Sequence, residues 1–317
     1  MSRIRCGIYF KFILFSLLTF LFLTGFISKK QPQKVSVVME YYPPQSFFSP
    51  VPQKVSTQDF NGLILNRLSG KDKTFFLSIY HLNSRLKQYE LKKKIKESQL
   101  EKIKNLLIST GFLKAVGIEV EITREIFSQM NLKPEYREYP WIRCLETVKT
   151  GNSDVVLAVV KTRQREQFLY YPSEPTVFET NSLFKLKTSK ITANGNLQSL
   201  KKYTIAATSG ASYGEKFDKA GFLKKERVSS AESIIRLVEN KRVDLGVGSV
   251  QTVTYLMNKM GLSNKLVFLK PPLGKEPLFA AFSRTKGHQK MAEEFSDRLA
   301  KFKKTKKYRA ILAKYGV

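Results

Sequence analysis

The stretch from Trp141 to Arg165 constrains the fold more than any other part of the sequence. Its first residues place apolar side chains at helical spacing up to Val148, and Gly151 follows where a helix commonly ends. Residues 154–160, DVVLAVV, then form an apolar β-branched run that is typical of a strand buried on both faces, as in a parallel sheet. A helix that leads directly into such a strand indicates an α/β fold.

Two polar residues, Thr162 and Arg165, follow this predicted strand. In open α/β sheets, ligands bind just beyond the carboxyl ends of the strands. A hydroxyl and a guanidinium at that place therefore predict a site that holds an anion.

Further strands and helices alternate along the chain on both sides of this stretch. A boundary region rich in Thr, Asn, Ser and Gly (188–199) separates two such series, which predicts two α/β units joined by extended crossovers. The elements predicted in chain order are a strand within 34–48 that breaks at Pro43-Pro44, a helix in 117–132, strands at 133–139 and 203–208, a helix at 229–242 capped by Ser230, a strand at 243–249, and a closing helical stretch.

The first 30 residues form a targeting segment. Basic residues precede the apolar run 12–27, which is shorter than the roughly 20 residues that a membrane span needs. No good small-residue cleavage site follows, so the segment is either a signal peptide or a retained N-terminal anchor. Both predict export, and we expect a periplasmic location.

Charge and cysteine content exclude other classes of function. The net charge of +29 would suit a nucleic acid, but it is spread along the chain without a nucleic-acid-binding motif, and an exported chain rarely meets nucleic acid. Cys144 is the one cysteine beyond the targeting segment, so no internal disulfide can form there. With two histidines and no cysteine cluster, we expect neither a metal site nor a cofactor.

Residues 49–113 do not fit the alternation of strands and helices and are predicted to be an insertion. Within it, residues 85–109 indicate a basic amphipathic helix. This helix could contact a partner or a membrane surface, or the whole segment could be a neutral loop insertion.

Several motifs in the same order resemble the bacterial extracellular solute-binding proteins of family 3, the polar amino-acid type that serves ABC importers. They cover residues 34–48 and 116–317. The matching segments are YYPP (41–44), GIEVEITREIF (117–127), PWIRCLETVKTGNSDVVLA (140–158), YYPSEP (170–175), SGASY (209–213), NKRVDLGV (240–247) and LAKFKKTKKYRAILAKYG (299–316).

The resemblance implies a periplasmic-binding-protein fold of type II, with two α/β lobes joined by a hinge and a ligand cleft between them. Lobe 1 would comprise 34–185 plus 279–317, with the insertion 49–113, and lobe 2 would comprise 186–278.

The resemblance also assigns roles to three residues around a ligand carboxylate. Arg165 would clamp the carboxylate, because its planar fork donates two parallel hydrogen bonds. Thr162 would add a hydroxyl beside it, and Ser212 would close on the same group from the second lobe. Structural alternatives stay open: Arg165 could cap a helix or pair with Glu174, and Ser212 could be an ordinary turn serine.

Four more residues would complete the cleft. Tyr42 would supply an aromatic lining, Glu40 would lie near the ligand's amino group or side chain, and Trp141 would pack on the ligand or in the helix core. Five residues after Asp244, amino-acid binders of the family usually carry a second acid, but this chain has Ser249. A buried ammonium without a carboxylate partner is costly, so an α-amino acid ligand would need Glu40.

We therefore expect an exported, monomeric binding protein that captures a small polar, carboxylate-bearing, amino acid-like solute for the membrane subunits of an ABC importer, without catalysis. A sensory receptor or an enzyme on the same fold is an alternative. A serine hydrolase is another, because residues 210–214 read G-x-S-x-G and Ser212, Asp244 and His288 occur in the order of a catalytic triad. Asp154 and Asp244 are expected to cap strand edges.

Overall fold

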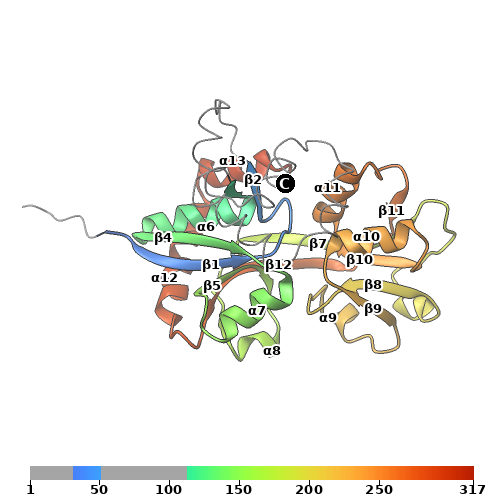
Figure 1. Cartoon of the computed structure of the whole chain (residues 1–317), viewed down its shortest axis with the longest axis horizontal. Helices are drawn as coiled ribbons and strands as arrows, with labels where there is room; N and C mark the ends of the chain where they lie inside the picture. The colour runs from blue at the N-terminus through green and yellow to red at the C-terminus, as the bar shows by residue number, and fades with distance from the viewer. Residues whose placement is uncertain (1–30, 51–112) are drawn as a thin grey trace, which may run out of the picture. The chain divides into compact units, whose positions relative to one another are not determined.

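One mixed β-sheet organises the computed structural model, which describes residues 31–50 and 113–317 (Figure 1). Its strand order is β4-β1-β5-β12-β7-β10-β8-β9, with β6 added beside β12 and β11 beside β7. The strands are β1 (Gln33–Met39), β4 (Leu132–Glu138), β5 (Val155–Val160), β6 (Leu169–Tyr170), β7 (Val177–Leu186), β8 (Thr204–Thr208), β9 (Lys224–Val228), β10 (Leu245–Ser249), β11 (Leu266–Phe268) and β12 (Gly274–Ser283). The predicted targeting segment and most of the predicted insertion, residues 51–112, lie outside the described residues.

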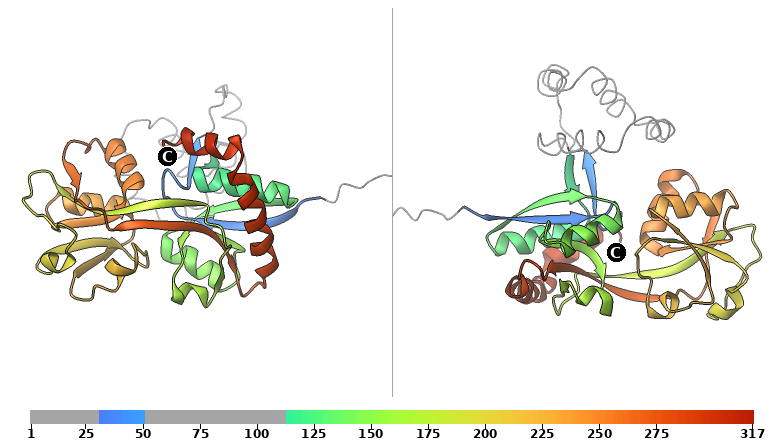
Figure 2. Two further views of the ribbon diagram at one scale, coloured as in Figure 1. Left: turned by 180° about the vertical axis from the view of Figure 1, so that it is seen from behind. Right: turned by 60° about the horizontal axis from the view of Figure 1, so that its bottom comes forward.

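Two long strands, β7 and β12, connect the two ends of this sheet, as the views of Figure 2 show. β7 pairs with β12 as far as Asn181 and with β10 from there on, and β12 changes partner from β7 to β5 at Leu278. We call the described residues of 34–176 together with 284–317 the first half, and residues 187–273 the second half. The predicted lobe boundaries near 185 and 278 remain a prediction.

The strand predicted at 154–160 is β5, and its apolar composition follows from helices on both of its faces. Val155 and Leu157 belong to the hydrophobic cluster of α6 (Ile118–Gln129) and α12 (Gln289–Lys303). Val156 and Val159 pack with α7 (Trp141–Lys149) on the other side. The strand is parallel to β1 but antiparallel to β12, so the sheet is mixed rather than purely parallel.

Side-chain caps mark the starts of helices in both halves. Ser230 caps α10 (Ala231–Glu239), and its hydroxyl accepts a hydrogen bond from the Ser233 backbone N–H, as predicted. The closing helical stretch is two helices, because Thr305 interrupts it after α12 and caps α13 (Lys306–Lys314). The remaining helices are α8 (Arg163–Glu166), η2 (Leu197–Leu200), α9 (Glu215–Asp218) and α11 (Val250–Met260).

The predicted insertion leaves and rejoins the sheet region at one place. β2 (Phe47–Pro50) pairs in antiparallel register with β3 (Leu113–Val116), and Phe47 lies opposite Val116. The chain ends on either side of 51–112 are therefore neighbours.

A search of the described helices for membrane-spanning segments finds none with the necessary length and hydropathy.

Candidate functional site

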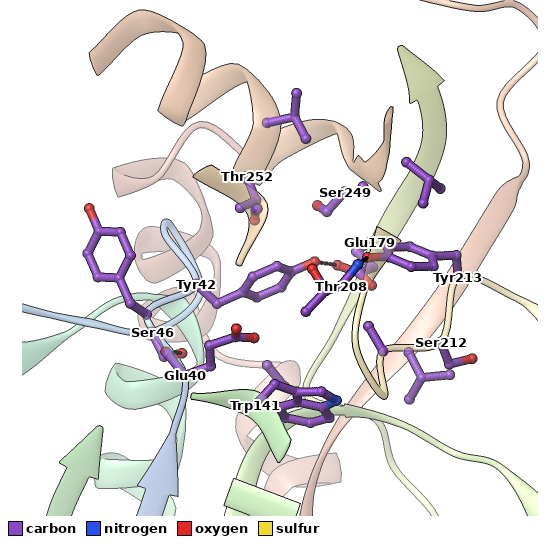
Figure 3. A pocket seen from close by; sticks show the side chains of 18 of the residues that line it. Glu40, Tyr42, Ser46, Trp141, Glu179, Thr208, Ser212, Tyr213, Ser249 and Thr252 are labelled. Atoms are coloured by element: carbon purple, nitrogen blue, oxygen red, sulfur yellow. Dashed lines mark hydrogen bonds between the residues drawn. The ribbon is translucent and has the colours of Figure 1, made fainter. Parts of the chain in front are cut away.

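A cavity of about 60 Å³ lies where the carboxyl ends of four strands meet (Figure 3). The strands β1 and β5 are parallel to each other, and so are β8 and β10 further along the sheet. Residues at or just after the carboxyl end of each of these four strands line the cavity. This is the position in which α/β sheets bind ligands. Of the seven residues predicted for the ligand site, six line the cavity: Glu40, Tyr42, Trp141, Arg165, Ser212 and Ser249.

Arg165 is held at the wall of the cavity by the short helix α8. Its side chain is 6 % exposed, and its guanidinium donates hydrogen bonds to the backbone oxygens of Val160 at 2.6 Å and Gly210 at 2.8 Å. Burial lowers the pKa of Arg165. Among the described residues, no carboxylate lies within 4.0 Å of the guanidinium. The alternative pairing with Glu174 is wrong, because Glu174 bonds Lys303 at 2.9 Å.

Trp141 meets Arg165 at the same backbone oxygen. The indole Nε1 donates to the Gly210 oxygen at 3.0 Å, and the guanidinium carbon of Arg165 lies 5.2 Å from the centre of the indole ring. Gly210 has φ +69°, and a Cβ there would collide with the Ile142 side chain. The first and second halves are therefore in direct contact across one wall of the cavity.

The opposite wall contains an acid that the sequence analysis missed, Glu179 on β7. It is 3 % exposed, and its Oε2 accepts a hydrogen bond of 2.6 Å from the Tyr42 hydroxyl. Burial raises the pKa of Glu179. The alternation of residues along β7 could have identified Glu179 from the sequence. Val177, Glu179 and Asn181 share the buried face of the strand, whereas Phe178 is exposed.

Glu40 reaches the cavity between two aromatic rings. Figure 3 shows its carboxyl group in the space between Tyr42 and Trp141. Burial, and to a lesser degree the charge of Glu138, raises the pKa of Glu40 to about 8. The cavity therefore brings two carboxyl groups and one guanidinium together.

The two predicted serines line the cavity with hydroxyl groups that already have partners. The Ser212 Oγ donates to the Asp218 carboxylate at 2.5 Å, which fixes the turn before α9. The Ser249 Oγ donates to the Gln251 side chain at 3.1 Å at the start of α11.

Thr162 is not among the residues that line the cavity. It is the N-cap of α8, and its Oγ1 accepts a hydrogen bond of 3.3 Å from the Arg165 backbone N–H. Its observed role is to position the arginine.

The catalytic triad predicted for the hydrolase alternative is not formed. The His288 Nε2 lies 2.7 Å from Asp154 Oδ1, while Asp244 accepts a hydrogen bond from the Thr204 backbone N–H at 2.8 Å. With Ser212 bonded to its own turn, the three residues do not form a triad. Asp244 acts as the predicted cap at a strand edge.

Other cavity residues were not predicted. The Thr208 backbone N–H donates to the Tyr213 hydroxyl at 2.9 Å, which orients that ring. Thr252, in the first turn of α11, is 1 % exposed, and its Oγ1 has no hydrogen-bond partner within the described chain. Among residues 31–50 and 113–317, no group of three or more His, Cys, Asp or Glu side chains could hold a metal ion.

Comparisons with known proteins agree on the family and the fold. Residues 108–317 match the sequence profile of the bacterial extracellular solute-binding proteins, family 3. A comparison with curated protein sequences finds no match.

Three solved structures that are similar to this chain are described as binding proteins or as a domain that resembles them. A histidine kinase sensor domain with similarity to periplasmic binding proteins has a TM-score of 0.63 and 18% identity, over 90% of this chain and 97% of that one. The substrate binding protein of an amino acid ABC transporter has a TM-score of 0.60 and 13% identity, over 89% and 99%. An ancestral arginine-binding protein bound to arginine has a TM-score of 0.60 and 15% identity, over 90% and 100%. At these identities the similarity shows the fold.

Proposed function

The chain belongs to the bacterial extracellular solute-binding proteins, family 3, and we propose that it captures a small carboxylate-bearing, amino acid-like solute outside the cytoplasm. The single observation that carries this proposal is Arg165, a buried guanidinium that lines the cavity with backbone oxygens as its hydrogen-bond acceptors.

The chemistry of Arg165 selects the ligand group. A buried charge is strongly destabilised unless an opposite charge lies beside it. Two of its five N–H groups donate to backbone oxygens, so N–H groups remain for a ligand at the cavity wall that Arg165 lines. A carboxylate fits a guanidinium because it accepts two parallel, charge-assisted hydrogen bonds. Arg165 is therefore proposed to bind the ligand's carboxylate.

Ligand entry requires the walls of the cavity to move apart. Its volume of about 60 Å³ is well below the roughly 150 Å³ that accommodates a benzene molecule. The walls come from both halves, and β7 and β12 connect the halves beside the cavity. We propose that a hinge in these strands opens the lobes and that the ligand is enclosed when they close.

The membrane partner is proposed to be an ABC importer, on the precedent of the amino acid transporter subunit among the similar structures. The similarity to a histidine kinase sensor domain favours a second candidate, a receptor that reports the solute to a membrane protein. Deletion of the gene in its host separates the two. Loss of uptake of the labelled ligand supports import, whereas normal uptake with a lost transcriptional response supports sensing.

A thermal-shift screen of the full chain tests solute capture directly. The panel contains L-amino acids, simple organic acids, short peptides and uncharged sugars. A ligand at 100 times its Kd stabilises the folded state by about 2.7 kcal/mol, which corresponds to a Tm increase of roughly 5–10 °C for a chain of this size. Calorimetry then gives the Kd for each hit. A panel in which uncharged sugars stabilise the protein and no carboxylate does would contradict the proposal.

A further inference from the structure

The C-terminal helices concentrate positive charge that capture of a small solute does not use. Residues 301–314, at the end of α12 and in α13, contain seven Lys or Arg and no Asp or Glu. Residues 113–176 of the same half contain nine basic and nine acidic residues. The net charge is therefore uneven within the fold, and α12 and α13, drawn in red in Figure 2, form a basic part of the first half.

Three of these seven basic residues have a structural role, because they join the C-terminal helices to the rest of the first half. Lys303 forms an ion pair with Glu174 at 2.9 Å. Lys307 and Lys314 pair with two acids of α6 at 2.5 and 2.6 Å. Packing of the helices thus accounts for these three side chains.

The other four basic residues of 301–314 are exposed and have no acidic partner. We call them the basic patch: Lys301, Lys304, Lys306 and Arg309. Within residues 31–50 and 113–317, no Asp or Glu oxygen lies within 4.0 Å of their side-chain nitrogens. The Arg309 Nη1 donates to the Lys304 backbone oxygen at 3.5 Å, so the guanidinium lies beside the end of α12 and the patch is continuous across the two helices.

The spacing of the basic patch places like charges side by side. Lys301 and Lys304 are three residues apart at the end of α12, as are Lys306 and Arg309 in the first part of α13. Residues at this spacing are neighbours on a helix surface, and like charges there destabilise the helix. An anionic partner would remove this repulsion, which indicates that the patch has one.

The absence of exposed apolar groups indicates what kind of partner this is. Phe302 and Ile311 are buried in the core of the first half, and Tyr308 and Leu312 pack against it, so residues 301–314 expose no large apolar side chain. The centre of a protein–protein interface is usually rich in aromatic residues and poor in lysine. A membrane surface of anionic headgroups needs only positive charge and attracts polybasic segments.

We propose that the basic patch docks the protein on a membrane surface that contains anionic phospholipids. Each Lys or Arg near such a surface contributes roughly fivefold to the affinity, so four of them suffice for reversible attachment. The contact is electrostatic and without insertion, because the apolar sides of both helices face the core. None of the four residues lines the cavity, so docking does not depend on the proposed ligand.

Sedimentation with lipid vesicles tests the proposal on the full-length protein. The vesicles consist of phosphatidylcholine alone or with about one third phosphatidylglycerol. At about 50 mM NaCl the parent protein should bind the anionic vesicles at least tenfold more tightly than the neutral ones, and about 500 mM NaCl should remove most of this difference through screening. Equal binding to both vesicles, as expected if the patch serves an acidic protein, would overturn the proposal.

Two variants with the same change in net charge locate the contact. The first replaces the four residues of the basic patch with Gln. The control replaces four exposed lysines of the second half that have no ion pair within the described chain: Lys187, Lys190, Lys201 and Lys224. The N-terminal segment is identical in all three proteins, so its own binding to lipid cancels in the comparison. The patch variant should lose at least tenfold in affinity for anionic vesicles and the control less than threefold, with unchanged ligand affinity in both. Equal losses would show a general effect of net charge and would overturn the proposal.

A measurement on the parent protein alone does not depend on how the variants fold. Acetylation of lysines, read by mass spectrometry, is compared with and without anionic vesicles. The vesicles should slow acetylation of Lys301, Lys304 and Lys306 at least threefold more than that of Lys187, Lys190 and Lys201. Uniform protection of the two groups, or none, would overturn the proposal.

Discussion

The guanidinium of Arg165 donates a hydrogen bond of 2.8 Å to the backbone oxygen of Gly210, which lies in the second half of the sheet. The indole of Trp141 donates to the same oxygen at 3.0 Å. A ligand carboxylate at Arg165 would compete with this oxygen, and a charged acceptor forms the stronger hydrogen bond with a guanidinium. The residue proposed to recognise the ligand is therefore also one that joins the two halves, which would couple binding to the proposed hinge motion.

Replacement of Arg165 should abolish binding. Arg165→Ala would remove the proposed bidentate contact with the ligand's carboxylate. Hydrogen bonds to charged groups contribute about 1.5–3 kcal/mol each, so we expect an affinity loss of at least 100-fold. Arg165→Lys should recover only part of it, because an ammonium cannot form the parallel pair of bonds. The control is Arg163→Ala, an exposed arginine on the same short helix. Equal affinity of Arg165→Ala and the parent protein by calorimetry would refute the proposal that Arg165 binds the ligand's carboxylate.

Trp141 should report ligand binding by its fluorescence. It is the only tryptophan of the chain, it lines the cavity, and its Nε1 bonds Gly210. Parting of the halves or entry of a ligand changes the surroundings of the indole, so the emission maximum should shift on titration with any ligand found in the thermal screen. Trp141→Phe should remove the signal, and calorimetry then shows what the indole contributes to the affinity. A ligand that binds without changing the emission would place its site elsewhere.

The sequence predicted the order of the elements better than the chemistry of the cavity. The helix that leads into β5 was found from apolar spacing, because burial on both faces leaves a continuous apolar run. Arg165 was found because it directly follows a strand, and the ends of strands meet at one edge of the sheet. These features depend on neighbours in the chain.

Glu179 was missed for the complementary reason. Its place at the cavity depends on pairing between β7 and β10, and on the hydroxyl of Tyr42, which is 137 residues away in the chain. The partners of Ser212 and Thr162 were also not predicted. Both hydroxyls form local hydrogen bonds around short helices that the periodicity of apolar residues does not indicate.

Asp154 should be important for stability and not for binding. It lies at the start of β5, and its carboxylate receives hydrogen bonds from the backbone and side chain of Ser36 at 2.7 and 2.6 Å. Lys286 and His288 bond its other oxygen at 2.6 and 2.7 Å. Asp154→Asn should reduce the free energy of unfolding by about 2 kcal/mol, since it weakens the charge-assisted hydrogen bonds from Ser36 and removes an ion pair with the exposed Lys286. Asp244→Asn is the control, because that exposed acid accepts one backbone hydrogen bond, and its loss should be about 1 kcal/mol.

The stabilising effect of Asp154 should weaken progressively in acid. Burial alone would raise its pKa, but Lys286, Ser36 and His288 together hold the pKa of Asp154 well below its ordinary value of 3.8. A depressed folded-state pKa contributes stability that is present above the unfolded-state pKa and is lost as the pH falls toward the folded-state value. The difference between parent and variant in urea unfolding should therefore begin to shrink below about pH 4 and shrink further as the pH falls. A constant difference from pH 7 to pH 3 would contradict the assignment.

Glu40 should have the opposite pH dependence. Burial, followed by the charge of Glu138, raises the pKa of Glu40 from 4.5 to about 8. Between these values the unfolded chain has released the proton and the folded protein retains it, so ionisation of Glu40 favours unfolding as the pH rises. Glu40→Gln removes this penalty and keeps the shape of the side chain. Its stability relative to the parent should increase from pH 5 to pH 8, and each 1 kcal/mol gained corresponds to a Tm increase of roughly 2–4 °C. Glu226→Gln, an exposed acid on β9, should show no such trend, and a parallel pH profile for Glu40→Gln and the parent would mean that Glu40 is already ionised in the folded protein.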